Sequence, residues 1–300
     1  MDIDRFIEQR TQLANISCKS HIVTVFGDVI SPHGDWVWLG SLIDALAPLG
    51  FSERLVRTSV FRLVKDDWLQ VRKAGRKSYY AFTDSAARTY TKTARRIYSG
   101  KTVSNQGRWL ILLPSFVGED KLPALKRQLL WLGFSQLASG VYAHPSMDKA
   151  TLHEMLVESE LSQSVIVFDS RTLGRDSNQV LKKLVHERWQ VEALQRDYRL
   201  LIDCYQPLIE LVKARKMIND RQSFLLRTLL IHEYRRILLK DHELPAQLLP
   251  KNWLASEAKE LVKTIYAELA RSSSRFITGQ MKNLDGLLPS SGQEFLKRFK

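Results

Sequence analysis

Four polar side chains on one face of a predicted helix carry the clearest chemical signal in this sequence. The segment 52–66 reads SERLVRTSVFRLVKD, and its apolar residues recur with helical spacing. The pattern predicts a helix that begins after the capping residue Ser52 and buries Leu55, Val56, Val60, Leu63 and Val64. The opposite face then carries Arg54, Arg57, Thr58 and Arg62. Arginine can bond both acceptors of a guanine, so this face could read the major groove of a DNA duplex.

A basic hairpin is predicted directly after this helix. Two β-type runs, 68–72 (WLQVR) and 78–83 (SYYAFT), are joined by the glycine-containing connection 73–77 (KAGRK). Its cations would contact DNA phosphates, which position a protein on the duplex without reading its sequence: Arg72, Lys73, Arg76 and Lys77. We expect Trp36 and Trp38 to pack in the core against the basic helix rather than to stack on bases.

The distribution of charge favours a nucleic-acid partner over a uniformly basic surface. The chain has 300 residues and a formal net charge of +13. Residues 54–101 hold thirteen Lys or Arg and three acidic residues, whereas residues 102–180 hold seven and eight. Clustered positive charge is typical of a protein that binds a polyanion. The alternative is a solvated helix face and hairpin tip, with the arginines paired to Glu53, Asp66 and Asp67.

The elements around the basic helix predict a winged helix-turn-helix domain over 1–100. Helices are expected at about 17–30 and 40–48, before the basic helix, and at about 84–98, after the hairpin. Trp36 to Leu39 form a short extended piece between the first two helices. The polar stretch 99–107 is expected to be a linker.

Two further domains are predicted, and the fold class is α+β multidomain. Residues 108–173 follow the order βαββαβ, with strands at 108–116, within 134–145 and at 164–170, and helices at 121–134 and 148–159. This order predicts a ferredoxin-like domain. Residues 174–300 are predicted to be all-helical, with strong helices at 223–241 and 253–276, a kink or break at Pro207, and a weakly patterned end.

Several classes of protein are disfavoured by the sequence. No apolar run approaches the roughly 18–20 residues of a membrane span, and the first residues lack the apolar core of a secretory signal. Cys18 and Cys204 suit reduced thiols in the cytoplasm. The phosphate-binding, dinucleotide-binding and nucleophile-elbow motifs of common enzymes are missing, as is the H-E-x-x-H metal motif. We therefore expect no catalytic residues, no metal site and no cofactor.

Three passages resemble the PaaX-type repressors of phenylacetic acid degradation. They are GFSERLVRTSVFRLVKDDWLQVRKAGRKSYYAFT at 50–83, LLWLGFSQLASGVYAHP at 129–145 and LLIHEYRRILLKDHELPAQLLPKNW at 229–253. The resemblance covers about residues 15–280. It implies a homodimeric repressor of phenylacetate (aromatic) catabolism genes that binds double-stranded operator DNA. It also implies a central domain similar to Cas2, here a candidate for dimerisation, and release from DNA by an aryl-acetyl-coenzyme A effector such as phenylacetyl-CoA.

The helical domain is the candidate effector site under this resemblance. Arg235 and Arg236 beside Lys240 could hold the phosphates of coenzyme A, because guanidinium groups bind phosphate with two parallel hydrogen bonds. Tyr234 and Trp253 could line a pocket for the aryl group, or could belong to the core. His232 could contact the ligand, but a histidine on a largely apolar helix is more often a satisfied, partly buried residue.

The sequence leaves two enzymatic alternatives open. A Cas2-like nuclease would need carboxylates that hold Mg²⁺ at the end of a strand. The first strand ends in Leu113-Pro114-Ser115-Phe116, and Asp169 at the last strand has no evident partner in the sequence. An enzyme acting on acyl-CoA would need a nucleophile and a base, and no such pair can be nominated. We therefore interpret the central domain as a scaffold.

Overall fold

The computed structural model describes most of the chain as two compact units. The described residues are 2–13, 17–98, 108–145, 149–213, 218–242, 244–292 and 298–299, without the side chains of 92, 93 and 131. The first unit contains residues 1–100, 200–236 and 256–300, and the second contains 101–199 and 237–255. The helical domain predicted at 174–300 is thus shared between the two units. The reason is that its long helices contribute residues to both.

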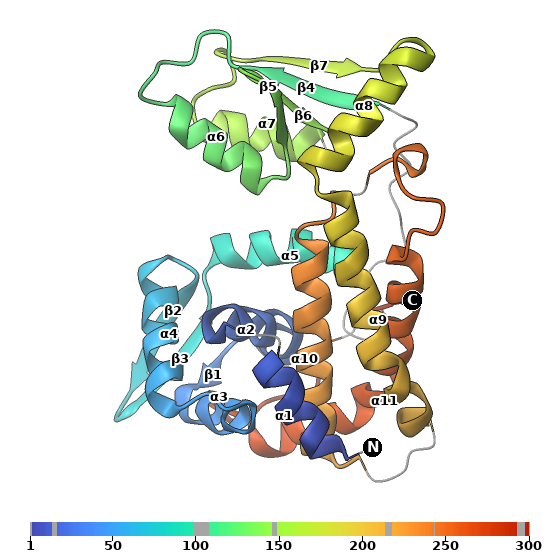
Figure 1. The fold of residues 1–300 in the computed structure, drawn as a ribbon. Coiled ribbons are helices and arrows are strands. Elements are labelled where there is room, and N and C mark those ends of the chain that lie inside the picture. Colours follow the sequence, from blue (N-terminus) through green and yellow to red (C-terminus); the bar gives the residue numbers. More distant parts are fainter. Residues whose placement is uncertain are drawn as a thin grey trace. The chain divides into compact units, whose positions relative to one another are not determined.

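The amino-terminal part of the first unit is a winged helix-turn-helix. It contains α2 (Cys18–Val25), α3 (Leu39–Leu46), α4 (Glu53–Lys65) and α5 (Asp84–Tyr98). Its three strands, β1 (Val37–Trp38), β2 (Leu69–Ala74) and β3 (Lys77–Phe82), form an antiparallel sheet in the order β1-β3-β2. Figure 1 shows α4 and the β2–β3 hairpin next to each other. The predicted order of elements is therefore confirmed.

The first predicted helix, 17–30, has two parts with different geometry. The Ser17 side chain caps α2 by accepting a hydrogen bond from the Ser20 amide, and the chain then continues as a π-helix over Phe26–Ile30. A Cβ added at Gly27 would lie 1.9 Å from the Tyr90 ring. The glycine therefore leaves the space that α5 fills with an aromatic ring. The π-turn also carries Asp28, a fully buried carboxylate.

The burial of α4 differs from expectation at two positions. Val56, Val60 and Leu63 are buried as predicted, whereas Leu55 is 44% exposed and Val64 is half-buried. Leu55 precedes Thr58 by three residues and Arg62 by seven, so helical geometry places it on the polar face. Phe61, which follows Arg57 by four residues, is 70% exposed. The exposed face of α4 is thus partly apolar as well as basic.

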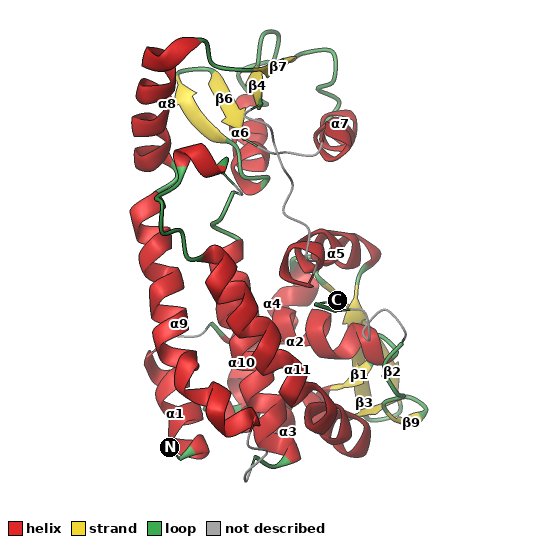
Figure 2. Cartoon of the chain, turned by 90° about the vertical axis from the view of Figure 1, so that its right-hand side faces the viewer, coloured by secondary structure: helices red, strands yellow, loops and turns green. Residues whose placement is uncertain are grey.

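Long helices complete the first unit. The helices α1 (Ile3–Leu13), α9 (Val191–Lys213), α10 (Asp220–Leu238) and α11 (Ala255–Gln280) lie beside one another in both views, α9 contributing from residue 200 onward (Figures 1 and 2). The sequence patterns did not indicate α1. Pro207 lies inside a continuous α9 rather than at a break. After α11, β8 (Lys282–Asn283) and β9 (Gly286–Leu287) form a short hairpin in the segment expected to be weakly patterned.

The second unit contains the predicted ferredoxin-like domain. Its elements are β4 (Trp109–Leu113), α6 (Leu122–Trp131), β5 (Ser135–Ala138), β6 (Val141–His144), α7 (Lys149–Glu158) and β7 (Ile166–Ser170). The sheet order is β5-β6-β4-β7 and all neighbours are antiparallel. Leu110 and Leu112 of β4 pack with Leu125, Leu129, Leu152 and Leu156 of α6 and α7 in one core.

The opposite face of this sheet is covered by later parts of the chain. Trp109 and Ala143 pack with Val185 of α8 (Gly174–Arg188), with Trp189 and with Leu248. Leu248 ends a short 3-10 helix, Ala246–Leu248, in the segment between α10 and α11. No described helix has the length and apolar character needed to cross a membrane.

Candidate DNA interface and the polar centre behind it

The predicted recognition face of α4 is exposed. The Ser52 hydroxyl accepts a hydrogen bond from the Leu55 amide (3.3 Å) and so caps the helix. Arg54, Arg57, Thr58 and Arg62 all lie on the solvent side. The Arg57 guanidinium contacts the Glu53 carboxylate (2.8 Å), an exposed pair that contributes about 0–1 kcal/mol and is easily exchanged for a phosphate or base. Arg54 and Arg62 have no ion pair within the described chain.

The hairpin presents its cations in two different ways. Lys73 and Arg76 flank Gly75, whose φ of +56° allows the tight turn at the tip. The guanidinium of Arg72 lies over the Trp36 ring (4.7 Å to the centroid), and the Lys77 ammonium lies over the Trp38 ring (4.9 Å). These cation–π contacts restrict two of the four predicted cations while leaving them exposed.

The two tryptophans correct one prediction. We expected Trp36 and Trp38 to be core residues against α4, but both are half-buried and are covered by cations of the hairpin. The register explains this, because Trp38 and Arg72 both pair with Tyr79 on β3 and therefore lie on one face of the sheet. Aromatic side chains thus hold the basic side chains of the hairpin in position.

A fully buried carboxylate ties the winged helix to the helices of the first unit. Asp28 accepts hydrogen bonds from Arg227 Nε on α10 (2.9 Å), Tyr98 on α5 (2.6 Å) and Tyr266 on α11 (3.0 Å). Arg298 Nη1 donates to the same carboxylate (2.8 Å). Despite the cost of burial, the charges of Arg227 and Arg298 lower the pKa of Asp28. The winged helix is therefore fixed to this helical bundle by an ionic centre.

This centre has further contacts that satisfy both arginines. Arg227 Nη2 and Arg298 Nη1 each donate to the Asp28 carbonyl oxygen (2.9 Å), and Arg227 Nη1 donates to the Ser273 hydroxyl (3.3 Å). The two guanidinium groups also stack over the Tyr266 and Tyr98 rings. No local sequence pattern predicts that these residues form a group, because they come from segments as much as 270 positions apart.

Comparison with family models covers nearly the whole chain. Residues 17–86 match the model of the PaaX-like protein, 104–181 match the PaaX protein central Cas2-like domain, and 189–279 match the PaaX-like protein C-terminal domain. The chain belongs to the PaaX-like family. It is 35% identical over 298 residues to the transcriptional repressor PaaX of Escherichia coli (strain K12), covering 99% of this chain and 94% of that protein. This identity makes it a PaaX-like transcriptional repressor and not an enzyme.

A solved structure also matches this PaaX-like chain. An uncharacterized protein, Rv0674 from Mycobacterium tuberculosis, is 19% identical and gives a TM-score of 0.48, with 85% of this chain and 97% of that chain covered.

The predicted effector residues of the PaaX-like protein lie in different environments. His232, Tyr234 and Arg235 are buried in the first unit, and Arg236 on the same helix is exposed. Trp253 belongs to the second unit, where its ring contacts Tyr198 edge to face (5.6 Å). Lys240, also in the second unit, pairs with Asp197 (2.8 Å). The structure therefore does not gather the five residues into one described pocket.

The buried candidates His232 and Arg235 face α2 of the winged helix. His232 Nδ1 shares a hydrogen bond with the Thr24 hydroxyl (3.0 Å), and the His232 ring lies 4.9 Å from that of His21. Arg235 donates to the same hydroxyl (3.4 Å). Burial lowers the pKa of His21 to about 3, and burial together with His21 and Arg235 lowers that of His232. Both histidines are therefore neutral near pH 7. No pattern in the sequence marks His21 as a neighbour of His232.

Asp169 of the PaaX-like protein is neutralised within its own unit, where its partners are two cations and not a second carboxylate. Its carboxylate accepts from Arg108 Nε and Lys149 Nζ (both 2.6 Å), and these bonds lower its pKa to about 2. In the described chain, no three His, Cys, Asp or Glu side chains lie close enough together to hold a metal ion. The geometry therefore gives no support to a metal-dependent nuclease at this strand.

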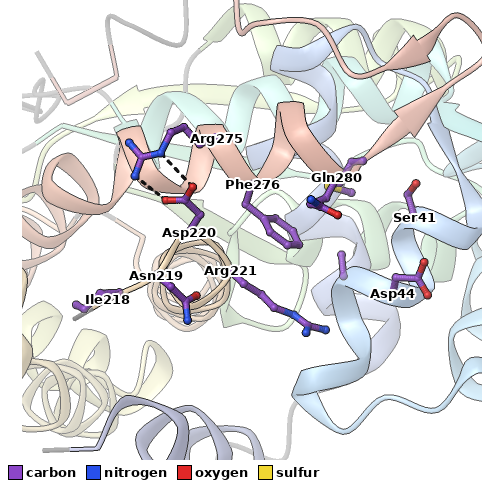
Figure 3. Close-up of a pocket in the computed structure, with 11 residues that line it drawn as sticks. Ser41, Asp44, Ile218, Asn219, Asp220, Arg221, Arg275, Phe276 and Gln280 are labelled. Atoms are coloured by element: carbon purple, nitrogen blue, oxygen red, sulfur yellow. Dashed lines mark hydrogen bonds and ion pairs between the residues drawn. The ribbon is translucent and has the colours of Figure 1, made fainter.

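A pocket of about 820 Å³ lies in the first unit (Figure 3). Asp44 on α3, Arg221 on α10 and Phe276 on α11 contribute to its walls. At one side, Arg275 binds Asp220 through two hydrogen bonds (2.6 and 3.0 Å). The described lining contains two arginines and two aspartates, so the pocket has no excess of positive charge.

Proposed function

We propose that this PaaX-like repressor reads operator DNA with α4 in the major groove and the β2–β3 hairpin on the phosphates. The observation that carries this proposal is the exposed row of Arg54, Thr58 and Arg62 on α4 beside a cationic hairpin. Base contacts from such a helix specify sequence, and phosphate contacts fix its position. Trp36 and Trp38 support the same role because they hold Arg72 and Lys77 toward one face.

The repressor acts as a homodimer in this proposal, and its partner surface belongs to the ferredoxin-like domain. Strand β7 is an edge strand of the sheet, and Ile166, Val167 and Phe168 on it are 44%, 40% and 47% exposed. Apolar side chains on an unpaired edge favour association with another chain. A two-fold dimer would present two copies of α4 to the half-sites of a partly palindromic operator.

The regulated genes are those of phenylacetate catabolism, and an aryl-acetyl-coenzyme A such as phenylacetyl-CoA releases the repressor in the cytoplasm. This part of the proposal rests on the family relationship and on the 35% identity to the transcriptional repressor PaaX. Release requires that the effector bind the DNA-free state more tightly than the DNA-bound state, since equal affinity would change nothing.

Alanine at both Arg54 and Arg57 is expected to weaken operator binding about tenfold to a hundredfold. One good contact between arginine and guanine contributes roughly 1–3 kcal/mol of discrimination. Genomic fragments retained by the purified protein would supply the operator, and mobility-shift titration at fixed salt would measure affinity. The matched control removes Lys126 and Arg127, two exposed cations on α6. Equal affinity of the Arg54/Arg57 variant and the wild type would show that α4 is not the recognition helix.

Phenylacetyl-CoA at micromolar concentration is expected to bind the protein calorimetrically and to release the retained DNA. Free phenylacetate and free coenzyme A serve as controls, because each carries only half of the effector. If the thioester binds without releasing DNA, it is a ligand but not the inducer. If it does neither, the assigned effector class is wrong, while the DNA-binding proposal is untouched.

A further inference from the structure

A pocket in the second unit has the chemistry of a site for an amphiphilic anion. Its volume is about 520 Å³, within the range of small-molecule sites. Trp109, Leu181, Pro245 and Leu248 give it an apolar side. Trp109 is only 5% exposed, so the ring forms a fixed wall rather than a mobile flap. An apolar acyl or aryl group would lose contact with water there, which favours binding.

Two cations line the same pocket. Arg175 and Lys182 of α8 are exposed, make no ion pair within the described chain, and share the lining with the amides of Asn178 and Gln179. The described lining contains no Asp or Glu. A positive pocket without carboxylates attracts anions, and both side chain types bind phosphate.

The polar surface of α8 continues into a neighbouring pocket of about 510 Å³. The two pockets share Gln179 and Lys182, and the second adds Lys183, His186 and the carboxylates of Glu187 and Glu192. Arg175, Gln179, Lys182 and His186 follow one another by three or four residues, so they form one stripe on the helix. Glu192 in the second pocket is engaged by His186 (2.6 Å). The excess of positive charge therefore lies in the first pocket, where Arg175 and Lys182 line the wall beside its apolar side.

We propose that the aryl-acyl-coenzyme A effector binds along α8, with its acyl group against Trp109 and its phosphates on Arg175 and Lys182. This inference rests on the effector class of the proposed function and assigns a place to it. The pocket of Figure 3 is the competing location in the first unit, but Asp44 and Asp220 in its lining oppose a polyanion. The residues predicted from sequence, His232 and Arg235, are buried among internal partners.

The α8 site is also placed to influence the rest of the chain. His186 Nε2 is bonded to the Leu248 carbonyl oxygen (2.8 Å), which joins α8 to the segment connecting α10 and α11. Leu248 itself lines the pocket. Both helices continue in the unit that contains the winged helix. Ligand contacts that shift Leu248 would therefore act on the segment between two helices that support the DNA-binding part.

Glutamate at both Arg175 and Lys182 is expected to weaken binding of phenylacetyl-CoA by at least about tenfold in titration calorimetry. The variant replaces both cations with carboxylates, which repel phosphate groups instead of binding them. A tenfold loss corresponds to about 1.4 kcal/mol. Both residues are exposed, so the full-length variant should fold normally. Arg188→Glu, on the same helix outside both pockets, is the matched control, and Arg221→Glu tests the competing pocket.

The apolar end of the site gives a second readout. Wild-type protein should bind phenylacetyl-CoA more tightly than acetyl-CoA, and Gln247→Trp, which enlarges an exposed lining residue, should reduce that difference. If the wild type binds none of these thioesters, the effector class and this site fail together. If the wild type binds and the Arg175/Lys182 variant binds equally well, only the α8 site is overturned. Loss of binding in Arg221→Glu alone would move the effector to the first unit.

Discussion

Asparagine in place of Asp28 is expected to lower the free energy of unfolding of the first unit by about 3–5 kcal/mol. The substitution keeps the shape of the side chain but removes the charge that compensates Arg227, which is fully buried, and Arg298. Breaking a buried ion pair by removing one partner costs about this much, because the remaining charge is left without compensation. The loss would be a large fraction of the stability of a typical domain.

Hydrogen exchange at peptides of α2 and α10 would measure this loss in the unit concerned, without interference from the second unit. Arg275→Ala is the matched control, because it breaks a solvent-exposed pair with Asp220 and should therefore change stability little. Arg227→Met combined with Asp28→Asn should be less destabilising than the sum of the two single changes, since methionine removes one of the two cations that Asp28→Asn leaves without compensation. If Asp28→Asn alone changes exchange no more than the control does, the ionic centre does not hold the unit together.

Secondary structure and the exposed basic face of α4 could be predicted because their signals are local. The basic helix was recognised from the Ser52 cap and from residues three and four positions apart, and the hairpin from Gly75 between two β-type runs. The βαββαβ order of the central domain follows from the same kind of pattern. These patterns involve residues that are close together in the sequence. The predicted helices and strands form because the tertiary structure favours the same elements as the local sequence.

The remaining features depend on residues that are distant in the sequence. Asp28 meets Arg227, 199 positions later, and nothing near either residue indicates this partnership. The misassigned burial of Leu55 has a similar origin, because an apolar residue on the border of a helix face is exposed or covered according to the neighbouring elements. Trp36 and Trp38 were assigned to the core by residue type alone, although hairpin cations cover them.

The candidate effector residues illustrate the same limit. His232, Tyr234 and Arg235 are adjacent in the sequence and polar, which made them candidates for a ligand. In the structure their helix packs toward α2, where Thr24 takes a hydrogen bond from Arg235 and shares one with His232. The residues proposed for the effector, by contrast, come from β4, α8 and the segment before α11. Only the folded chain places these three segments around one pocket.

Acidification from pH 7 to pH 5 is expected to cost the first unit about 2 kcal/mol through His21 alone. Burial lowers the pKa of His21 from an ordinary value of 6.5 to about 3. The folded state therefore binds fewer protons than the unfolded state, so stability is complete above pH 6.5 and falls as the pH drops below it. Each pH unit within this window costs about 1.4 kcal/mol. His232, in ring contact with His21 and with a pKa lowered mainly by burial, adds to the loss in the same direction.

The histidines can be separated from the ionic centre by the pH range in which each acts. The pKa of Asp28 is lowered from 3.8, so its contribution is lost only as the pH falls below about that value, whereas the loss from His21 begins near 6.5. Exchange at α2 and α10 peptides should therefore accelerate between pH 6.5 and 4.5, after correction for the intrinsic pH dependence of exchange.

His21→Leu should remove about 2 kcal/mol of the difference in stability between pH 7 and pH 5, because leucine fills the site without titrating. His153→Leu, at an exposed position of α7, should leave that difference unchanged. An unaltered pH dependence in His21→Leu would mean that this ring reaches water in the folded protein, and the packing of α2 against α10 would then be looser than the contacts of His21 and His232 indicate.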